Sequence, residues 1–137
     1  MTRPATIIVL TWNGWDLTRQ CLDSLRGTEL DAATVLVVDN GSSDGTVDNL
    51  RAYDWVRVLP LPANLGFVRG NNAGLEAADP ASDVVLVNND MVFTQRDWLS
   101  RLRRTAASHP RAGVVGRRLT LPDLRLLHAG TSILADA

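Results

Sequence analysis

The sequence TIIVLTWNGW, residues 6–15, sets a pattern that recurs along the chain. Residues 6–11 form an unbroken apolar and β-branched run, which is typical of a strand covered on both faces of a parallel sheet. A polar, glycine-containing loop follows at residues 12–15. A strand that ends in such a loop and gives way to a helical pattern indicates a βα unit.

Three further strands are predicted at residues 35–38, 56–59 and 84–87, with helical patterns between them. The first helical pattern places Leu17, Cys21 and Leu25 on one face, and two others cover residues 47–52 and 68–78. This alternation predicts an α/β fold with a mostly parallel sheet, in the strand order 3-2-1-4, flanked by helices.

Local signals suggest where the helices begin and end. Asp16 is an expected N-cap of the first helix, and Gly27 is placed where a left-handed C-terminal cap would lie. Thr94 and Asp97 are spaced as in a capping box before a later helix. Beyond that helix, residues 113–134 read as strands around a Pro122-Asp123 turn.

Length and composition limit the class of protein. The 137 residues fit one domain, 1–137, and 45% of them are hydrophobic. A net charge of −1 gives no global field for nucleic acid, although all fourteen basic residues are arginine. The single cysteine, Cys21, excludes an internal disulfide framework, and no early apolar stretch is long enough to span a membrane. We therefore expect a cytoplasmic protein with no nucleic-acid partner.

Polar residues follow the first, second and fourth predicted strands, where ligands bind in open parallel sheets. Thr11 and Asn13 follow the first strand, Asp39 and Asn40 the second, and residues 88–90 the fourth. A carboxylate at this edge can accept hydrogen bonds from a nucleoside, and a second carboxylate can hold a divalent cation. These types of side chain suit a nucleotide diphosphate.

Four motifs in this order resemble those of family 2 glycosyltransferases. They are TWN at residues 11–13, VVDNGSSDGT at 37–46, NLGFVRGNNAG at 64–74, and NND at 88–90. The resemblance runs from about residue 6 to residue 130 and extends to the bacterial rhamnosyltransferase-like branch. It implies the GT-A (Rossmann-like) fold, of which this chain is the nucleotide-sugar-binding portion.

The resemblance also implies a reaction and its site. The reaction is transfer of a sugar, with inversion, from a UDP- or dTDP-sugar to a carbohydrate or lipid-linked acceptor, with Mg²⁺ or Mn²⁺ and at the inner face of the membrane. Asp90 becomes the metal ligand, with Asn88 and His128 as further candidates. The implied nucleotide-binding residues are Thr11, Asn13, Asp39, Asn40, Asn64, Arg69 and Asn89.

Several of these residues also have a structural interpretation. Asp39 and Asn40 suit a simple turn, Asp90 a cap, and Asn64 a local bond to the backbone. Arg69 suits a solvated helix, His128 a surface position, and Trp12 and Trp15 are interpreted as packing residues.

No candidate for the catalytic base is found. Deprotonating an acceptor hydroxyl normally needs a carboxylate, and beyond Asp97 the only acids are Asp123 and Asp136. We therefore expect a truncated chain that lacks the acceptor side. The alternative is a non-catalytic nucleotide or nucleotide-sugar binding module. A dehydrogenase is disfavoured because the first loop lacks the G-x-G-x-x-G pattern.

Overall fold

The computed structural model describes residues 3–128 of the chain. The chain divides into two compact units, residues 1–96 and residues 97–137. The assignment of residues 1–137 to a single domain stays a prediction.

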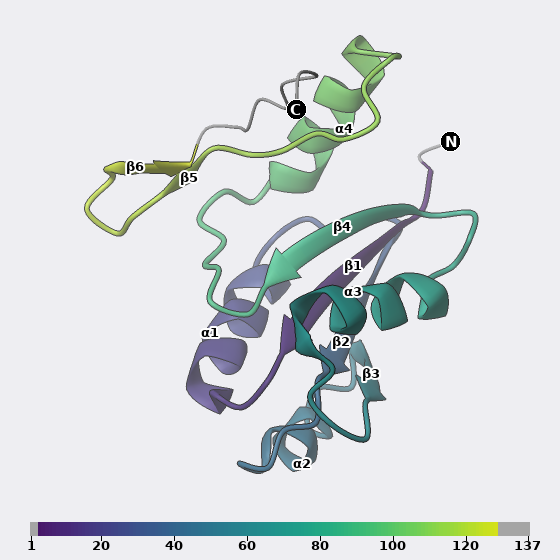
Figure 1. Cartoon of the computed structure of the whole chain (residues 1–137). Coiled ribbons are helices and arrows are strands. Elements are labelled where there is room, and N and C mark those ends of the chain that lie inside the picture. Colours follow the sequence, from purple (N-terminus) through teal and green to yellow (C-terminus); the bar gives the residue numbers. More distant parts are fainter. Residues whose placement is uncertain (1–2, 129–137) are drawn as a thin grey trace, which may run out of the picture. The chain divides into compact units, whose positions relative to one another are not determined.

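The first unit is built on a four-stranded parallel sheet in the order β3-β2-β1-β4 (Figure 1). This order is the one predicted from the sequence. It places the carboxyl ends of all four strands at one edge. Strands β2 and β3 are added on one side of β1 and β4 on the other, so the strand order reverses between β1 and β4. The strands are β1 (Ala5–Thr11), β2 (Ala33–Asp39), β3 (Val56–Pro60) and β4 (Asp83–Asn88).

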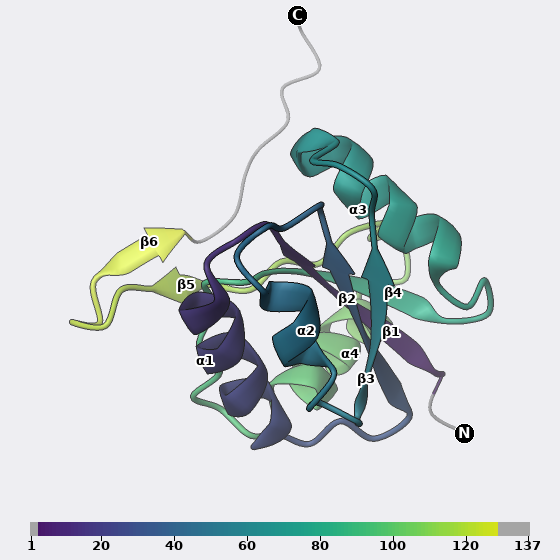
Figure 2. The same ribbon diagram turned by 90° about the horizontal axis from the view of Figure 1, so that it is seen from below.

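Three helices connect these strands. They are α1 (Trp15–Arg26), α2 (Thr46–Leu50) and α3 (Gly66–Ala77). Figure 2 shows α1 and α3 on opposite faces of the sheet. The chain after α2 contacts α1, because the Tyr53 ring meets Trp15 edge to face and its hydroxyl donates to Asp23.

The middle of the sheet is buried on both faces. Ile7, Ile8 and Val9 of β1 are completely inaccessible to solvent, as are Val37 and Val38 of β2. This explains the unbroken apolar runs, because a strand between two helical layers has no face that would carry polar residues. Full burial of such a side chain stabilises the fold by about 1.5–3 kcal/mol.

Two glycines let α3 lie unusually close to the sheet. A Cβ atom on Gly70 would lie 2.7 Å from a methyl carbon of Leu10, and one on Gly74 would lie 2.7 Å from Cγ2 of Ile8. Asn71, between them, is also buried. The face of α3 that carries these residues is therefore fitted to β1 and β2.

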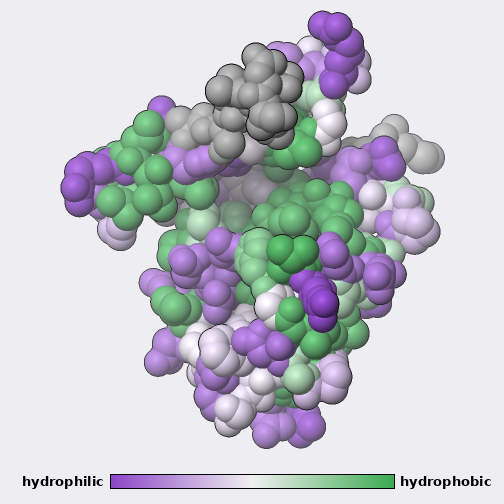
Figure 3. Space-filling model, in the orientation of Figure 1, coloured by the Kyte–Doolittle hydropathy of each residue, from purple (hydrophilic) through white to green (hydrophobic). Residues whose placement is uncertain are grey.

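On the same side of the sheet, α3 leaves the outer strand β4 uncovered. The register pairs Leu86 with Ile8, so both side chains project from this face. Val84 and Leu86 are nonetheless exposed, as are Val68 and Leu75 of α3. Figure 3 shows the resulting apolar surface over α3 and β4.

The predicted cap of α1 is wrong. Its N-cap is Gly14, at φ 70°, and Asp16 lies inside the first turn. The carboxylate of Asp44 instead accepts the backbone N–H of Trp15 at 3.3 Å, so a residue distant in sequence satisfies the helix end. The hydrogen bond from Thr46 lowers the pKa of Asp44, which keeps this acceptor charged. The left-handed cap predicted at Gly27 is also wrong, because its φ is −73°.

The capping box predicted at Thr94 is wrong for a similar reason. Helix α4 (Trp98–Ser108) begins only after Asp97, which caps it without a side-chain bond. The preceding segment has no regular structure at residues 91–95 and a turn at residues 96–97, and two tertiary bonds hold it, from the Phe93 N–H to Ser24 Oγ and from the Glu29 N–H to the Arg96 carbonyl. These bonds delay the start of the helix.

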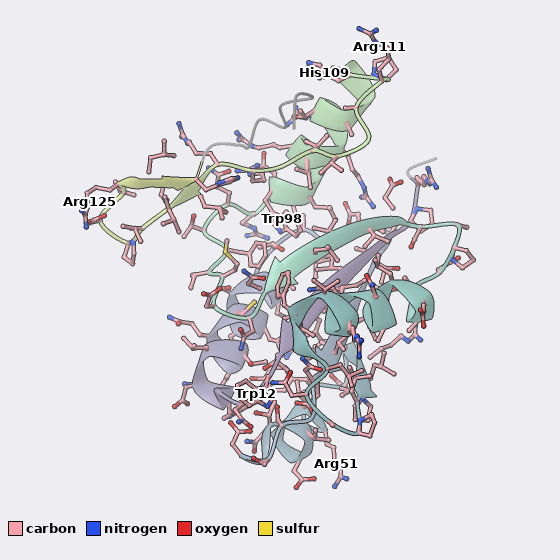
Figure 4. The ribbon with its side chains drawn as sticks, in the orientation of Figure 1. Trp12, Arg51, Trp98, His109, Arg111 and Arg125 are labelled. Atoms are coloured by element: carbon pink, nitrogen blue, oxygen red, sulfur yellow. The ribbon has the colours of Figure 1, made fainter. Side chains whose placement is uncertain are left out.

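The second unit contains α4 and an antiparallel hairpin of β5 (Leu119–Thr120) and β6 (Leu126–His128). The predicted turn at 122–123 is confirmed. The strand predicted to begin at residue 113 is wrong in its length, because residues 113–118 have no regular structure, and residues 129–134 of the prediction lie outside the described residues. Arg125, labelled in Figure 4, pairs with Asp123 at 2.6 Å in this turn. Within residues 3–128, every helix is too short or too polar to cross a bilayer.

The close approach of α3 predicts the effect of one added methyl group. Gly74→Ala would bring Cβ to 2.7 Å from Ile8 and 3.0 Å from Val38, two β-branched side chains that move little. We expect it to lower the free energy of unfolding by about 1–3 kcal/mol in urea denaturation. Asn72→Ala, on the exposed face of α3, is the control and should be neutral or slightly stabilising. A Gly74→Ala chain as stable as wild type would contradict this packing.

Candidate functional site

A crevice of about 360 Å³ opens at the carboxyl edge of the sheet. Its volume is within the range of small-molecule sites, and it lies beside the point where the strand order reverses. Of the predicted site residues, Thr11, Asn40, Asn64, Asn88, Asn89 and Asp90 line it. The other lining residues are Leu10, Trp12, Gly66 and Phe67.

Asn13 joins the loop after β1 to the loop after β2. Its backbone N–H donates to Ser42 Oγ at 2.7 Å, and its side-chain oxygen accepts the Ser43 N–H at 2.9 Å. Asn13 and Gly14 both have left-handed backbone conformations, at φ 54° and 70°, which Asn and Gly tolerate best. The two loops therefore form one rigid wall.

Asp39 ends β2 and is only 1% exposed. One carboxylate oxygen, Oδ2, accepts the Ser42 N–H at 2.9 Å. The other, Oδ1, is buried without a hydrogen-bond partner among the described residues. Leaving a buried acceptor unpaired costs about 1–3 kcal/mol, so a native protein that keeps one has a reason to do so. A ligand N–H or O–H donor would satisfy this oxygen once the residues that cover it move aside.

Asn40 holds the turn that leads into α3. Its side-chain nitrogen donates to Asn64 Oδ1 at 3.0 Å and to the Gly66 carbonyl at 3.3 Å, and its oxygen accepts the Leu65 N–H at 2.9 Å. Asn64 also accepts the Gly66 N–H, at 2.8 Å. Both amides therefore bond to the protein, as the structural interpretation of Asn64 predicted.

Gly41 allows the same turn to come close. A Cβ atom at this position would lie 2.5 Å from the backbone carbonyl carbon of Ala63, and its φ of 76° also favours glycine. The DNG sequence at the end of β2 is therefore not only a simple turn, because it also brings the loops after β2 and β3 together.

At the end of β4, one side chain faces the interior of the protein and its two neighbours are exposed to solvent. Asn89 is half-buried, and its nitrogen donates to Thr11 Oγ1 at 3.3 Å and Thr18 Oγ1 at 3.1 Å. Asn88 and Asp90, on either side of it, are exposed in the crevice. The predicted placement of Asp39 and Asp90 at the same edge of the sheet is confirmed.

The donor set at Asp90 fits a cation that a ligand helps to hold. No group of three or more His, Cys, Asp or Glu side chains suited to a metal ion exists in the described part of the chain. Mg²⁺ is commonly bound by one or two carboxylates together with substrate phosphates. Asp90, with the Asn88 amide as a neutral donor beside it, meets that requirement.

Cys21 lies beneath this turn but is not suited to bind metal. Its Sγ is 3.8 Å from the carbonyl oxygen of Asn88 and can donate to it. Burial, and then the charge of Asp90, raise the pKa of the thiol from 9.0 to about 12. Metal ligation requires the thiolate, so Cys21 is a buried neutral residue.

Four predicted site residues lie outside the lining of the crevice: Asn13 and Asp39, in the loops described above, and Arg69 and His128. Arg69 is exposed on α3, and His128 is exposed at the end of β6 in the second unit. Their predicted roles remain predictions.

Two aromatic residues of the crevice were missed as site residues. Trp12 is 56% exposed, so its interpretation as a packing residue is wrong, whereas Trp15 does pack, with its ring 5.7 Å from Tyr53. Figure 4 labels Trp12 at the end of β1, and Phe67, 62% exposed, lines the crevice from the start of α3. The position of Trp12 just beyond a strand is the signal that could have identified it.

A second depression, of about 520 Å³, lies over the outer face of α1. Its lining includes Arg19, which forms ion pairs with Asp16 and Asp23 along the helix. Such pairs are typical of a solvated helix surface. The crevice at the strand ends is therefore the better candidate.

Residues 6–123 match the sequence profile described as "Glycosyl transferase family 2". The chain belongs to this family. Its relatives include N-acetylglucosaminyl-diphospho-decaprenol L-rhamnosyltransferase from Mycobacterium tuberculosis, which is 31% identical over 90% of this chain and 43% of the relative. The uncharacterized protein y4gI from Sinorhizobium fredii is 33% identical over 93% of this chain and 14% of the relative.

Solved structures show the same fold. The mannosyltransferase PcManGT from Pyrobaculum calidifontis, in complex with GDP-Man and Mn²⁺, matches with a TM-score of 0.74 and 26% identity, over 89% of this chain and 37% of that one. S. aureus TarS 1-349 in complex with UDP-GlcNAc matches with a TM-score of 0.68 and 23% identity, over 86% and 37%. The predicted GT-A fold is confirmed. The chain of the present protein spans less than half the length of these relatives.

The environment of Cys21 predicts its reactivity. A pKa raised from 9.0 to about 12 lowers the thiolate fraction near neutral pH about a thousandfold. We therefore expect iodoacetamide to leave the native chain unlabelled and to label the urea-unfolded chain readily, as measured by mass spectrometry. Rapid labelling of the native chain would show that the thiol beneath Asn88 is not buried.

Proposed function

We propose that the crevice at the carboxyl edge binds the nucleotide diphosphate of a UDP- or dTDP-sugar. The protein would transfer that sugar, with inversion, to a hydroxyl of a carbohydrate or lipid-linked acceptor. The observation that carries this proposal is that two carboxylates lie at one edge of the sheet. Asp39 has a buried oxygen without a partner among the described residues, and Asp90 is exposed. The named activities of the mycobacterial and archaeal relatives support it.

Asp39 would bind the nucleoside. Its free oxygen accepts a hydrogen bond from a base N–H or a ribose hydroxyl, which removes the cost of leaving that oxygen unpaired. Trp12, which lines the crevice, offers an exposed aromatic face, and base stacking on such a face is worth about 1–3 kcal/mol. Asn13 and Asn40 keep this end of the crevice in shape through their bonds to the neighbouring loops.

Asp90 would act at the diphosphate end, through Mg²⁺ or Mn²⁺. When bound, the cation neutralises charge on the diphosphate as it leaves the sugar. Asn88 contributes an amide oxygen without charge, so more of the coordination falls to the phosphates. The protein alone would consequently bind the cation weakly, and the nucleotide and the cation would bind together.

A base for the acceptor hydroxyl is not evident in the described residues. Asp123, the only described acid beyond Asp97, is bonded to Arg125 in the hairpin turn. We propose that the 137-residue chain binds the donor but transfers little sugar by itself. This observation also favours the second candidate function, a non-catalytic nucleotide-sugar binding module. Product formation with a panel of nucleotide sugars would distinguish the two.

For the whole protein, we propose a cytoplasmic location at the inner face of the membrane and a part in cell-wall or polysaccharide synthesis. A lipid-linked acceptor, such as the name of the mycobacterial relative indicates for that enzyme, would require access to that surface. Fractionation of cells that express the native reading frame would test the location.

The assigned roles predict different metal dependence for two substitutions. Asp39→Ala should weaken binding of UDP or dTDP about tenfold or more, with or without Mn²⁺, because a hydrogen bond to a charged group is worth about 1.5–3 kcal/mol. Asp90→Ala should weaken it mainly when Mn²⁺ is present. Calorimetric titration in Mn²⁺ and then in chelator measures both effects.

Asp83→Ala is the matched control for these variants. Asp83 lies at the opposite end of β4 and pairs with Arg3 at 3.2 Å on the surface, so its loss should leave nucleotide affinity unchanged. If Asp90→Ala lost equal affinity with and without metal, its assignment as the metal ligand would be wrong.

A further inference from the structure

Helix α1 holds the segment after β4 through three side chains on one face. Thr18, Cys21 and Ser24 are spaced three residues apart, so they lie along one side of the helix. The contacts join Thr18 to Asn89 Nδ2 at 3.1 Å, Cys21 to the Asn88 carbonyl at 3.8 Å, and Ser24 to the Phe93 N–H at 3.0 Å. This segment has no regular secondary structure and therefore depends on these bonds.

Thr18 also contacts Thr11, the last residue of β1. Thr18 has no solvent exposure, and its hydroxyl lies 2.7 Å from that of Thr11. Both hydroxyl oxygens lie within reach of Asn89 Nδ2, which can donate to each of them. The two hydroxyls can donate onward to each other and to the carbonyl of Asn13 or Gly14, so every donor in the cluster has an acceptor.

This cluster determines which way the turn faces. With Asn89 anchored inward, Asn88 and Asp90 on either side of it are exposed in the crevice. We propose that Thr18 is a positioning residue for Asp90, acting through the side chain of Asn89. The proposal rests on the proposed function, because it gives Asp90 the role of holding the cation and the diphosphate.

Substitution of Thr18 by valine isolates the hydroxyl. Valine has nearly the same shape, but it removes one of the two hydroxyl acceptors of Asn89, leaving only that of Thr11, and it removes the hydroxyl partner of Thr11. Serine at the same position restores the oxygen. Thr6→Val is the matched control, because Thr6 is a buried threonine at the other end of β1 whose hydroxyl lies 2.7 Å from that of Ser82. It should lose a similar bond without touching the crevice.

The experiment measures binding and local exchange in the 137-residue chain. Calorimetry gives the affinity for dTDP and UDP with Mn²⁺ and with chelator, and hydrogen exchange follows the peptide that covers residues 88–93. We expect Thr18→Val to lower the affinity in Mn²⁺ about threefold to tenfold, to leave the affinity in chelator unchanged, and to speed exchange in that peptide. Thr18→Ser and Thr6→Val should resemble wild type in both measurements.

A double-mutant cycle tests whether Thr18 acts through Asn89. The combination of Thr18→Val with Asn89→Ala should weaken Mn²⁺-dependent binding no more than Asn89→Ala alone. Additive losses would overturn the route through Asn89. If Mn²⁺ raises the nucleotide affinity of wild type and of Thr18→Val by the same factor, the role of Thr18 is overturned and the proposed function still stands. If nucleotide binding to wild type ignores Mn²⁺, the proposed function fails, and the role of Thr18 toward the cation fails with it.

Discussion

Backbone groups that leave a parallel sheet lose the hydrogen bonds of the strand ladder, and at the carboxyl edge of this sheet three asparagines join the segments that follow the strands. Asn13 bonds the loop after β1 to the loop after β2, and Asn40 bonds the end of β2 to the turn before α3. Asn89 ties the segment after β4 to Thr11 and Thr18. An amide suits this task because it donates and accepts at once. Through these bonds and the Trp15–Asp44 bond, the loops form one connected edge around the crevice.

The same network leaves two carboxylates available for chemistry. Asp39 gives one oxygen to Ser42 and keeps the other buried and unpaired, while Asp90 is held outward beside the anchored Asn89. An unpaired buried acceptor destabilises the empty protein, and a nucleoside donor would recover that free energy on binding. Stability and affinity are thus linked at Asp39. At Asp90 the carboxylate is exposed to solvent, so its charge destabilises the folded chain little. It would contribute to binding when a cation is coordinated by both Asp90 and a diphosphate.

Sequence reasoning predicted the sheet well because the physical signal is strong. Residues 6–11 and 35–38 are apolar without interruption, and only a strand between two helical layers needs such a run. The shared edge of Asp39 and Asp90 followed from the rule that ligands lie beyond the carboxyl ends of parallel strands. Helix ends were predicted poorly, since Asp44 caps α1 from another loop and Ser24 holds the Phe93 N–H. Such tertiary partners leave no trace in the local sequence.

The roles of individual site residues were only partly accessible from the sequence. The motifs identified Asn40 and Asn89 as parts of the site. They did not reveal that both amides already form hydrogen bonds within the protein. Thr18 drew no attention, because a threonine inside a helical pattern is ordinary until its partners are known. Trp12 was interpreted as a packing residue because tryptophan is usually buried, whereas its place at the end of β1 exposes it to the crevice.

The central claim is that one cross-linked edge of the sheet binds a nucleotide diphosphate and its cation. Amide chemical shifts of the isotope-labelled chain, followed as dTDP or UDP is added with Mg²⁺ and then with Mn²⁺, test it most directly. We predict shifts in the loops at residues 11–15, 39–44, 62–67 and 88–91, with Mn²⁺ broadening centred on Asp90. Residues at the amino edge, such as Ala32 and Ser82, should not change. Shifts centred on the amino edge or on the outer face of α1, or no shifts at all, would contradict the account.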